Sequence, residues 1–375
     1  ALCTLGNGYF AVRGAAYESE ASKIHYPGTY IAGVYNKLAT HIAGRTIYNE
    51  DMVNCPNWLF LTFRVADGEW FSPSRSRILY YHQELNMRDG VLYRKVRFRD
   101  NRGRITRVET RRIVYMQNPH LGAIEYIIIP ENYSGILTVR SLVDGAVLNT
   151  GVERYRQLNC KHLLPWCLGT FSKNGVFLGV RTNQSHIQIA IASRIKVSVG
   201  EKIKEPLIKN LVKGRERIEQ VFRVFVSQKV PCRIEKTVGI YTSRDQGIKD
   251  LPKSAIEAVR RAPSFGRLYE SHRRYWHSLW KKFDIQIKGD KFSQRVVRLH
   301  IFHLLQTASI HNTKIDAGFP ARGLHGESYR GHIFWDEIFI MHLYDLHLPE
   351  VSRALLLYRY RRLPAALRYA KRHNY

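Results

Sequence analysis

The feature that most constrains the fold is a change of hydrophobic period near residue 250. Before it, apolar and polar residues alternate with a period of two, the spacing of a β-strand with one buried face. The alternating runs lie at residues 122–129, 136–143, 187–192, 195–199, 218–226 and 234–241. Short turns rich in Gly, Asn, Asp and Pro separate them, so the sequence predicts a large antiparallel β-sandwich rather than a parallel sheet.

After residue 250 the apolar residues recur at helical spacing. Helices are predicted at residues 254–261, 269–283, 292–309, 333–346 and 349–372. Pro349 suits the first turn of the last helix, whereas Pro364 is expected to kink or divide that helix. The last helix has an apolar stripe but no following element to cover it, which suggests a protein cut off inside its second domain.

Net positive charge is the most unusual property of the composition. The 375 residues include 59 Lys and Arg against 31 Asp and Glu, a formal net charge of +28. The basic residues are spread along the chain, and no zinc-finger, RNA-reading or basic-zipper signature occurs, so nucleic-acid binding is disfavoured. An alternative explanation of the charge is attraction of anionic phosphate.

Membrane, secretion and metal-binding signals are missing from the sequence. No run of about 18 apolar residues could span a bilayer and no charged-then-apolar leader opens the chain, so a cytoplasmic location is expected. The five cysteines include no C-x-x-C pair and are expected to be reduced. His300 and His303 could share a helix face, but core or surface roles are favoured, and no metal or organic cofactor is expected.

The densest group of chemically active residues lies in a glycine-rich loop at residues 320–339. Within sixteen residues it contains Arg322, His325, Glu327, Arg330, His332, Trp335, Asp336 and Glu337. A bound sugar needs an apolar surface against its ring and a fixed carboxylate or amide for its hydroxyls, and Trp335 beside Asp336 supplies both. The alternative is structural: Arg330 or Arg322 would pair with Glu327 or Asp336 to hold the loop, and Trp335 would be a core residue.

The segment from Tyr329 to Asp336, Tyr-Arg-Gly-His-Ile-Phe-Trp-Asp, resembles a motif of glycoside hydrolase family 65, which includes maltose, trehalose and kojibiose phosphorylases. Further similar segments follow the family's order at residues 5–14, 26–36, 54–59, 118–121 and 303–307. The resemblance implies a galactose-mutarotase-like β-sandwich, linker helices and an (α/α)6 barrel. We therefore expect the sandwich at residues 1–248, the helical linker at 249–290 and the start of the barrel, truncated, at 291–375.

The resemblance also implies a reaction. In the family, a glutamic acid protonates the glycosidic oxygen while phosphate attacks the anomeric carbon from the opposite face, which inverts the configuration. That acid and most of the phosphate-binding residues come from later barrel helices. No catalytic residue is therefore assigned in this chain, and the general acid is expected beyond Tyr375. Neither Glu327 nor Glu337 matches the motif that contains it.

Binding of the glucosyl unit is the property that the resemblance transfers to this chain. Trp335 and Asp336 match positions that line the glucosyl pocket, and Arg330 and His332 match the loop that shapes it. One departure is visible, because many phosphorylases read Trp-Asp-Thr-Glu where this chain reads Trp-Asp-Glu and lacks the threonine. The position of Glu337 and the choice of sugar are therefore left open.

The leading hypothesis is the N-terminal part of a cytoplasmic, inverting phosphorylase that cleaves an α-linked glucose disaccharide with inorganic phosphate. The product would be β-glucose 1-phosphate, the full-length protein would be a homodimer, and these 375 residues alone would be inactive. A hydrolase of the same family that uses water is one alternative. A non-catalytic carbohydrate-binding or dimerisation module is a second, and a basic nucleic-acid-binding protein is a third.

Overall fold

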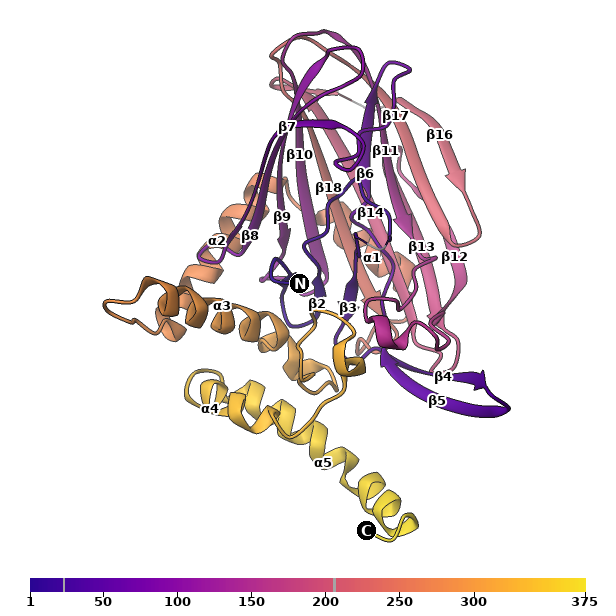
Figure 1. The fold of residues 1–375 in the computed structure, drawn as a ribbon, viewed down its shortest axis with the longest axis vertical. Helices are drawn as coiled ribbons and strands as arrows, with labels where there is room; N and C mark the ends of the chain where they lie inside the picture. The colour runs from indigo at the N-terminus through magenta and orange to yellow at the C-terminus, as the bar shows by residue number, and fades with distance from the viewer. Residues whose placement is uncertain (23, 205–206) are drawn as a thin grey trace.

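The computed structural model describes residues 1–22, 24–204 and 207–375 (Figure 1). Strands occupy the first two thirds of the chain and five α-helices the remainder, in the order that the change of period predicts. The change falls between the last strand, β18 (Cys232–Thr242), and the first helix, α1 (Leu251–Arg261). The predicted fold class, antiparallel β-sheets followed by helices, is confirmed. The limits of the domains, 1–248, 249–290 and 291–375, stay predictions.

Nine strands of the described residues form the larger sheet, and all their pairings are antiparallel. In spatial order they are β12 (Leu163–Phe171), β13 (Gly175–Thr182), β14 (Gln188–Val199), β18, β10 (Leu121–Pro130), β9 (Ile105–Val114), β8 (Val91–Arg99) and β7 (Arg77–Asn86), with β15 (Lys202–Lys204) beside β14. The runs expected at 187–192 and 195–199 are one strand, because Ser193 and Arg194 between them pair with β18 without a break.

A second sheet packs against the larger one and closes the sandwich. Its strands are β16 (Leu207–Lys213), β17 (Arg217–Val226), β11 (Gly135–Asp144) and β6 (Leu61–Val65). Val139 and Phe222 of this sheet share one buried core with Ile191 and Ile234 of the larger sheet. Alternate residues of each strand thus point into the core, which is why the period of two in the sequence is informative.

Two smaller β-units lie at the end of the sandwich nearest the helices (Figure 1). The first contains β1 (Leu5–Gly6), β2 (Phe10–Val12) and β3 (Thr29–Ile31). The second is a hairpin of β4 (Tyr35–Ile42) and β5 (Arg45–Met52) that projects from the body of the molecule. Its tip is exposed, whereas Asn49, Asp51 and Met52 near its base are buried. The base of the hairpin is therefore part of the packed interior.

Helices α1 and α2 (Phe265–Phe283) cover the face of the larger sheet opposite the smaller sheet. The Asp250 carboxylate caps α1 by accepting a hydrogen bond from the backbone N–H of Lys253 (2.9 Å). The contacts of α1 with the sheet pair Ala255 and Val259 with Ala190 and Ala192 of β14. Small side chains on the strand let the helix lie close to the sheet.

The remaining helices, α3 (Lys291–Thr307), α4 (Glu337–His347) and α5 (Pro349–Arg372), lie below the sandwich in Figure 1. The predicted division of α5 at Pro364 is wrong, because one helix continues through this residue, whereas the predicted kink stays a prediction. A proline removes one N–H from the helix ladder, and the bonds on either side keep this solvent-exposed segment helical. Helix α4 begins at Glu337 rather than at residue 333. No described helix is both long and apolar enough to cross a membrane.

Candidate functional site

The glycine-rich loop between α3 and α4 returns to the sandwich, where Glu327 anchors it. This side chain is 5% exposed. The hydroxyls of Tyr26 and Tyr30 donate to its Oε1 atom, the latter at 3.1 Å, and the backbone N–H of Gly151 donates to Oε2 at 2.8 Å. All three donors belong to the sandwich half of the chain. Glu327 therefore ties the loop to the sandwich, and both oxygens of its carboxylate accept hydrogen bonds.

The electrostatics of Glu327 reflect this enclosure. Burial raises the pKa of its carboxyl above the ordinary value, although the hydroxyl and amide donors act in the opposite direction. Burial and the neighbouring carboxylate together raise the pKa of both the Tyr26 and Tyr30 hydroxyls, so they stay protonated donors. The charged group and its donors stabilise one another only while the loop is in place.

Arg330 forms a second anchor, three residues further along. Its Nη1 atom lies 2.9 Å from Oδ1 of Asp51 on β5, and its guanidinium group lies over the ring of Tyr155, 4.3 Å from the centroid. The structural reading of an arginine that holds the loop is thus observed, with Asp51 as its partner in place of Glu327 or Asp336. Arg330 is therefore positioned to shape the loop through its contact with β5.

The backbone at this anchor is strained. Tyr329 and Arg330 have φ angles of 53° and 56°, in the left-handed region that side chains with a Cβ rarely occupy. Gly331 follows with φ 69°, and a Cβ there would collide with the side chain of Met52. Strain of this kind persists where surrounding contacts hold it, and it is concentrated at functional sites.

His332 links the loop to the base of the hairpin. Its Nε2 atom lies 2.8 Å from the backbone oxygen of Glu50, so that nitrogen carries the proton. The hydroxyl of Tyr35 also reaches the carbonyl oxygen of Gly331. His332 and Phe334 line a cavity of about 720 Å³ between this part of the sandwich and α5. His332 is thus a predicted site residue that lies beside an open cavity.

Trp335 and Asp336 stand at the start of α4. Trp335 is 71% exposed and touches the ring of Phe339 edge-on, with centroids 5.4 Å apart. Asp336 is half-buried and precedes the first helical residue, but its side chain makes no capping hydrogen bond. The core reading of Trp335 is therefore wrong. The aromatic ring is exposed and the adjacent carboxylate is half-buried, and neither residue lines the cavity beside His332.

Glu337 has a structural environment. It is 3% exposed, its Oε1 atom accepts a hydrogen bond from the backbone N–H of Phe319 (3.0 Å), and its Oε2 atom pairs with Nε of Arg359 (2.8 Å). These contacts join the start of α4 to the loop and to α5. Both oxygens of this carboxylate are therefore engaged within the chain.

Of the two histidines predicted to share a helix face, His300 is exposed and His303 is half-buried. The ring of His303 lies 4.3 Å from that of His325, and burial lowers the pKa of His303 to about 4 and that of His325 to about 3. Both are therefore neutral at physiological pH. Within the described ranges no group of three or more His, Cys, Asp or Glu residues is arranged to hold a metal ion, and all five cysteines are free.

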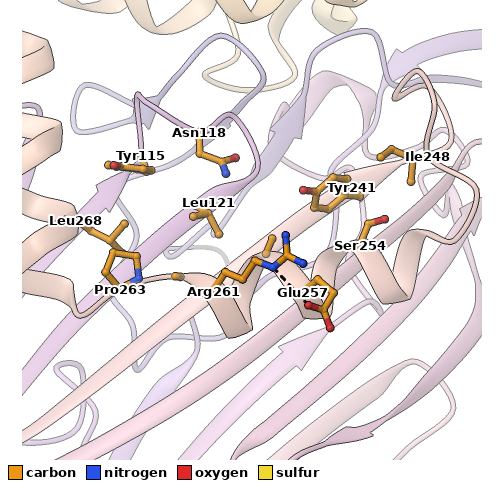
Figure 2. Close-up of a pocket in the computed structure, with 12 residues that line it drawn as sticks. Tyr115, Asn118, Leu121, Tyr241, Ile248, Ser254, Glu257, Arg261, Pro263 and Leu268 are labelled. Atoms are coloured by element: carbon orange, nitrogen blue, oxygen red, sulfur yellow. Dashed lines mark ion pairs between the residues drawn. The ribbon is translucent and has the colours of Figure 1, made fainter.

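A separate cavity of about 460 Å³ lies between α1 and the larger sheet (Figure 2). Tyr115, Leu121 and Tyr241 form part of its wall. Glu257 and Arg261, which also line it, form an ion pair with each other at 3.6 Å. The loop at residues 320–339 contributes nothing to it. This cavity is therefore independent of the predicted site.

Sequence reasoning missed the sandwich residues that hold the loop. Tyr26, Tyr30 and Asp51 precede their partners by 301, 297 and 279 residues. The local sequence around them carries no chemical pattern that would indicate a site. The only available signal was that residues 26–36 form one of the segments similar to the family.

Comparison with known proteins agrees with the motif. Residues 1–279 match the N-terminal domain of glycosyl hydrolase family 65, and residues 298–375 match the central catalytic domain of that family. The chain is 44% identical over 373 residues to an uncharacterized glycosyl hydrolase of Mycobacterium tuberculosis, covering 99% of this chain and 28% of that protein. It is 34% identical to kojibiose phosphorylase of Caldanaerobacter subterraneus, covering 100% of this chain and 48% of the relative.

A further relative is trehalose 6-phosphate phosphorylase of Lactococcus lactis, with 34% identity over 99% of this chain and 46% of the relative. The chain thus spans less than half the length of each of these relatives. Its fold matches a solved structure described as a candidate kojibiose phosphorylase from the human microbiome, with a TM-score of 0.84 and 18% identity over 96% of this chain and 46% of that one. The matched segments include both the sandwich and the loop, and the chain belongs to glycosyl hydrolase family 65.

Proposed function

We propose that this chain is the N-terminal part of an inverting phosphorylase that cleaves an α-linked glucose disaccharide with inorganic phosphate. The observation that carries the proposal is the exposed ring of Trp335 beside the carboxylate of Asp336, which has no ion-pair partner among the described residues, at the start of a catalytic-domain helix. Relatives named kojibiose, trehalose 6-phosphate and nigerose phosphorylases support both the α-glucosidic substrate and phosphate as the attacking group.

The roles in this proposal are taken from the family resemblance and combined with the positions of the side chains. Asp336 accepts hydrogen bonds from glucose hydroxyls, and Trp335 packs against the apolar face of the ring. Arg330 and His332 position this pair through their contacts with the sandwich. Neither Glu327 nor Glu337 is proposed as the general acid, because both carboxylates are engaged within the chain, and the family resemblance places the acid beyond residue 375. The product is β-glucose 1-phosphate, and no metal or organic cofactor takes part.

A substrate panel tests the reaction. The protein with its complete catalytic domain is incubated with kojibiose, trehalose, nigerose, maltose or trehalose 6-phosphate, each with and without inorganic phosphate. We expect β-glucose 1-phosphate only when phosphate is present, detected by ³¹P NMR. Glucose released equally without phosphate would instead identify a hydrolase. The 375 residues alone are expected to give no product.

Light scattering on the complete protein tests the proposed homodimer, and cell fractionation tests the cytoplasmic location.

A second experiment tests the site itself. Trp335→Ala and Asp336→Asn are compared with Trp166→Ala, which removes a 40% exposed indole on the sandwich strand β12. We expect kcat/KM for the disaccharide to fall about tenfold or more for each loop variant, since hydrogen bonds to charged groups contribute about 1.5–3 kcal/mol. Trp166→Ala should change it little. Equal values for all three variants would remove Trp335 and Asp336 from the substrate site.

A further inference from the structure

A second cavity, of about 470 Å³, adjoins the loop on the side of the sandwich. Three arginines from separate parts of the chain line it: Arg13 after β2, Arg154 in the short helix η1 (Glu153–Tyr155), and Arg322 in the loop. Ser328 and Tyr329 also line this cavity. We call Arg13, Arg154, Arg322, Ser328 and Tyr329 the arginine pocket. Its volume lies within the range of small-molecule sites.

The charges of the arginine pocket are not balanced. No Asp or Glu lines this cavity, and in the described part of the chain none of its three arginines forms an ion pair. Arg13 donates to the backbone oxygen of His325 (2.8 Å), Arg154 donates to the hydroxyl of Tyr155 (2.7 Å), and Arg322 lies over the ring of Tyr329. Each guanidinium has five N–H donors, so most of these donors are unused.

The nearest carboxylates do not supply the missing negative charge. Glu327 has an electrostatic interaction with Arg13, but its carboxylate is buried and accepts hydrogen bonds from two tyrosine hydroxyls and a backbone N–H. Glu153 has a 90% exposed side chain and faces Arg156 at 4.0 Å. His325, which also lines the cavity, is neutral because burial lowers its pKa to about 3. Three cations thus surround a cavity without a counter-charge.

The backbone is adapted to this arrangement. Gly326 has φ 159°, and a Cβ there would come within 2.7 Å of Nη1 of Arg13, so glycine admits the guanidinium to the pocket. Tyr329 holds its left-handed backbone with a side chain that is 46% exposed. Its ring contacts that of Phe334 at 5.9 Å, and Phe334 directly precedes Trp335. Tyr329 of the arginine pocket thus contacts the residue that precedes Trp335 in the sequence.

We propose that the arginine pocket binds a phosphoryl group, an inference that rests on the proposed function. A phosphoryl dianion offers three acceptor oxygens, and arginine binds such groups through paired, charge-assisted hydrogen bonds. The Ser328 hydroxyl and the Tyr329 ring add a polar and an apolar contact for an attached sugar. The phosphoryl group has two sources, the inorganic phosphate that attacks the glycosidic bond and a phosphate ester on the disaccharide, and the experiment separates them.

The variants are Arg322→Ala, Arg322→Lys and Arg154→Ala in the protein with its complete catalytic domain. Arg261→Ala is the matched control, because it also removes one exposed arginine from the wall of a cavity of similar volume (Figure 2). Two quantities are measured: KM for inorganic phosphate at saturating disaccharide, and kcat/KM for the disaccharide found by the panel relative to its 6-phosphate.

If inorganic phosphate occupies the arginine pocket, the alanine variants raise its KM about tenfold or more and leave the preference between the two disaccharides unchanged. If a sugar phosphate occupies it, the alanine variants lower the preference for the 6-phosphate by a similar factor and leave KM for phosphate unchanged. Arg322→Lys should recover part of either loss, because the charge remains. Arg261→Ala should change neither quantity. If the alanine variants also change neither, the inference is wrong.

Failure of the proposed function is distinguishable from failure of this inference. Should the complete protein release no sugar phosphate, calorimetric titration with inorganic phosphate and with glucose 6-phosphate still tests the arginine pocket. Binding that is weakened by Arg322→Ala and unaffected by Arg261→Ala supports the pocket without the reaction. Titrations that show no binding of either compound to the unaltered protein contradict it.

Discussion

At the scale of single residues, Glu327 shows how a carboxylate in a conspicuous loop can be structural. Its two oxygens receive hydrogen bonds from Tyr26, Tyr30 and Gly151, and 5% of the residue is exposed. A catalytic acid needs contact with its substrate, and this group faces the sandwich instead. Its function is to hold the loop.

Glu327→Gln tests this role. The amide oxygen can still accept from the two tyrosines, but the amide nitrogen would then face the backbone N–H of Gly151, and two donors would oppose each other. We expect the free energy of unfolding to fall by about 1–3 kcal/mol in urea denaturation, the cost of leaving a buried donor unsatisfied. Glu153→Gln, at a 90% exposed position, should change it by less than about 0.5 kcal/mol. Equal stability of the two variants would contradict the anchoring role.

Lys236 makes a second prediction at this scale. It is fully buried between the two sheets, where its Nζ atom donates to the backbone oxygens of Phe60 (3.1 Å) and Leu142 (3.0 Å). Burial lowers its pKa to about 7, from an ordinary value of about 10.5. A neutral amine has two N–H donors, which match these two acceptors. Between these pH values the unfolded chain binds more protons than the folded one, so stability from this residue rises with pH.

Lys236→Met removes the titrating group at similar length. We expect the free energy of unfolding of the unaltered chain to rise between pH 7 and pH 10 relative to that of the variant, measured by urea denaturation at several pH values. Below pH 7 the difference between the two proteins should be constant, because the lysine is then protonated in both the folded and unfolded states. A difference that does not depend on pH above 7 would show that Lys236 keeps its proton.

At the scale of elements, the joint between the loop and strand β5 decides where the start of α4 lies. Arg330, Gly331 and His332 contact Asp51, Met52 and Glu50 in turn. These contacts join three consecutive residues of the loop to three consecutive residues of β5. They keep the chain out of a helix until Glu337, and they leave Trp335 and Asp336 at the point where the helix begins.

Gly331→Ala tests the joint. The new Cβ would collide with Met52 in addition to the strain of φ 69°. Gly103→Ala is the control for strain alone, because Gly103 has φ 77° and open space around it. We expect the melting temperature to fall for both, and further for Gly331→Ala, since the left-handed conformation alone costs about 1–2 kcal/mol. In the complete protein only Gly331→Ala should raise KM for the disaccharide. Equal melting temperatures would mean that the loop moves aside without cost.

At the scale of the whole molecule, helices α4 and α5 carry several exposed apolar side chains. Among the large apolar side chains with at least half their surface exposed are Phe339, Leu346, Leu356, Leu363 and Leu367 of α4 and α5. Exposed apolar side chains on two adjoining helices favour association. The relatives, of which this chain spans less than half, have further sequence that this surface could contact.

For the 375 residues alone we expect self-association that depends on concentration, measured by sedimentation velocity. The double substitution Leu363→Lys and Leu367→Lys should reduce it, because two charges would enter the apolar face of α5. Ile136→Lys with Ile203→Lys adds the same charge at exposed positions on two sandwich strands, β11 and β15, and should have little effect. Equal reduction by both pairs would assign the effect to net charge rather than to the helix face.

The sequence by itself determined the order of sheet and helix and the positions of the strands β10, β11, β14, β17 and β18. These features depend on neighbours along the chain, because a period of two or of 3.6 reports which residues share a face. It could not show that the runs at 187–192 and 195–199 form one strand, or that α5 continues through Pro364, because the surrounding bonds decide both.

Only the tertiary structure decided which residues hold the loop and which remain free for a ligand. Glu327 and Asp336 are both carboxylates nine residues apart in one loop, yet one is enclosed by sandwich hydroxyls and the other is half-buried. Tyr26, Tyr30 and Asp51 lie nearly 300 residues away, and contacts over that separation depend on the path of the whole sandwich. The same holds for the arginine pocket, whose three cations meet only after folding.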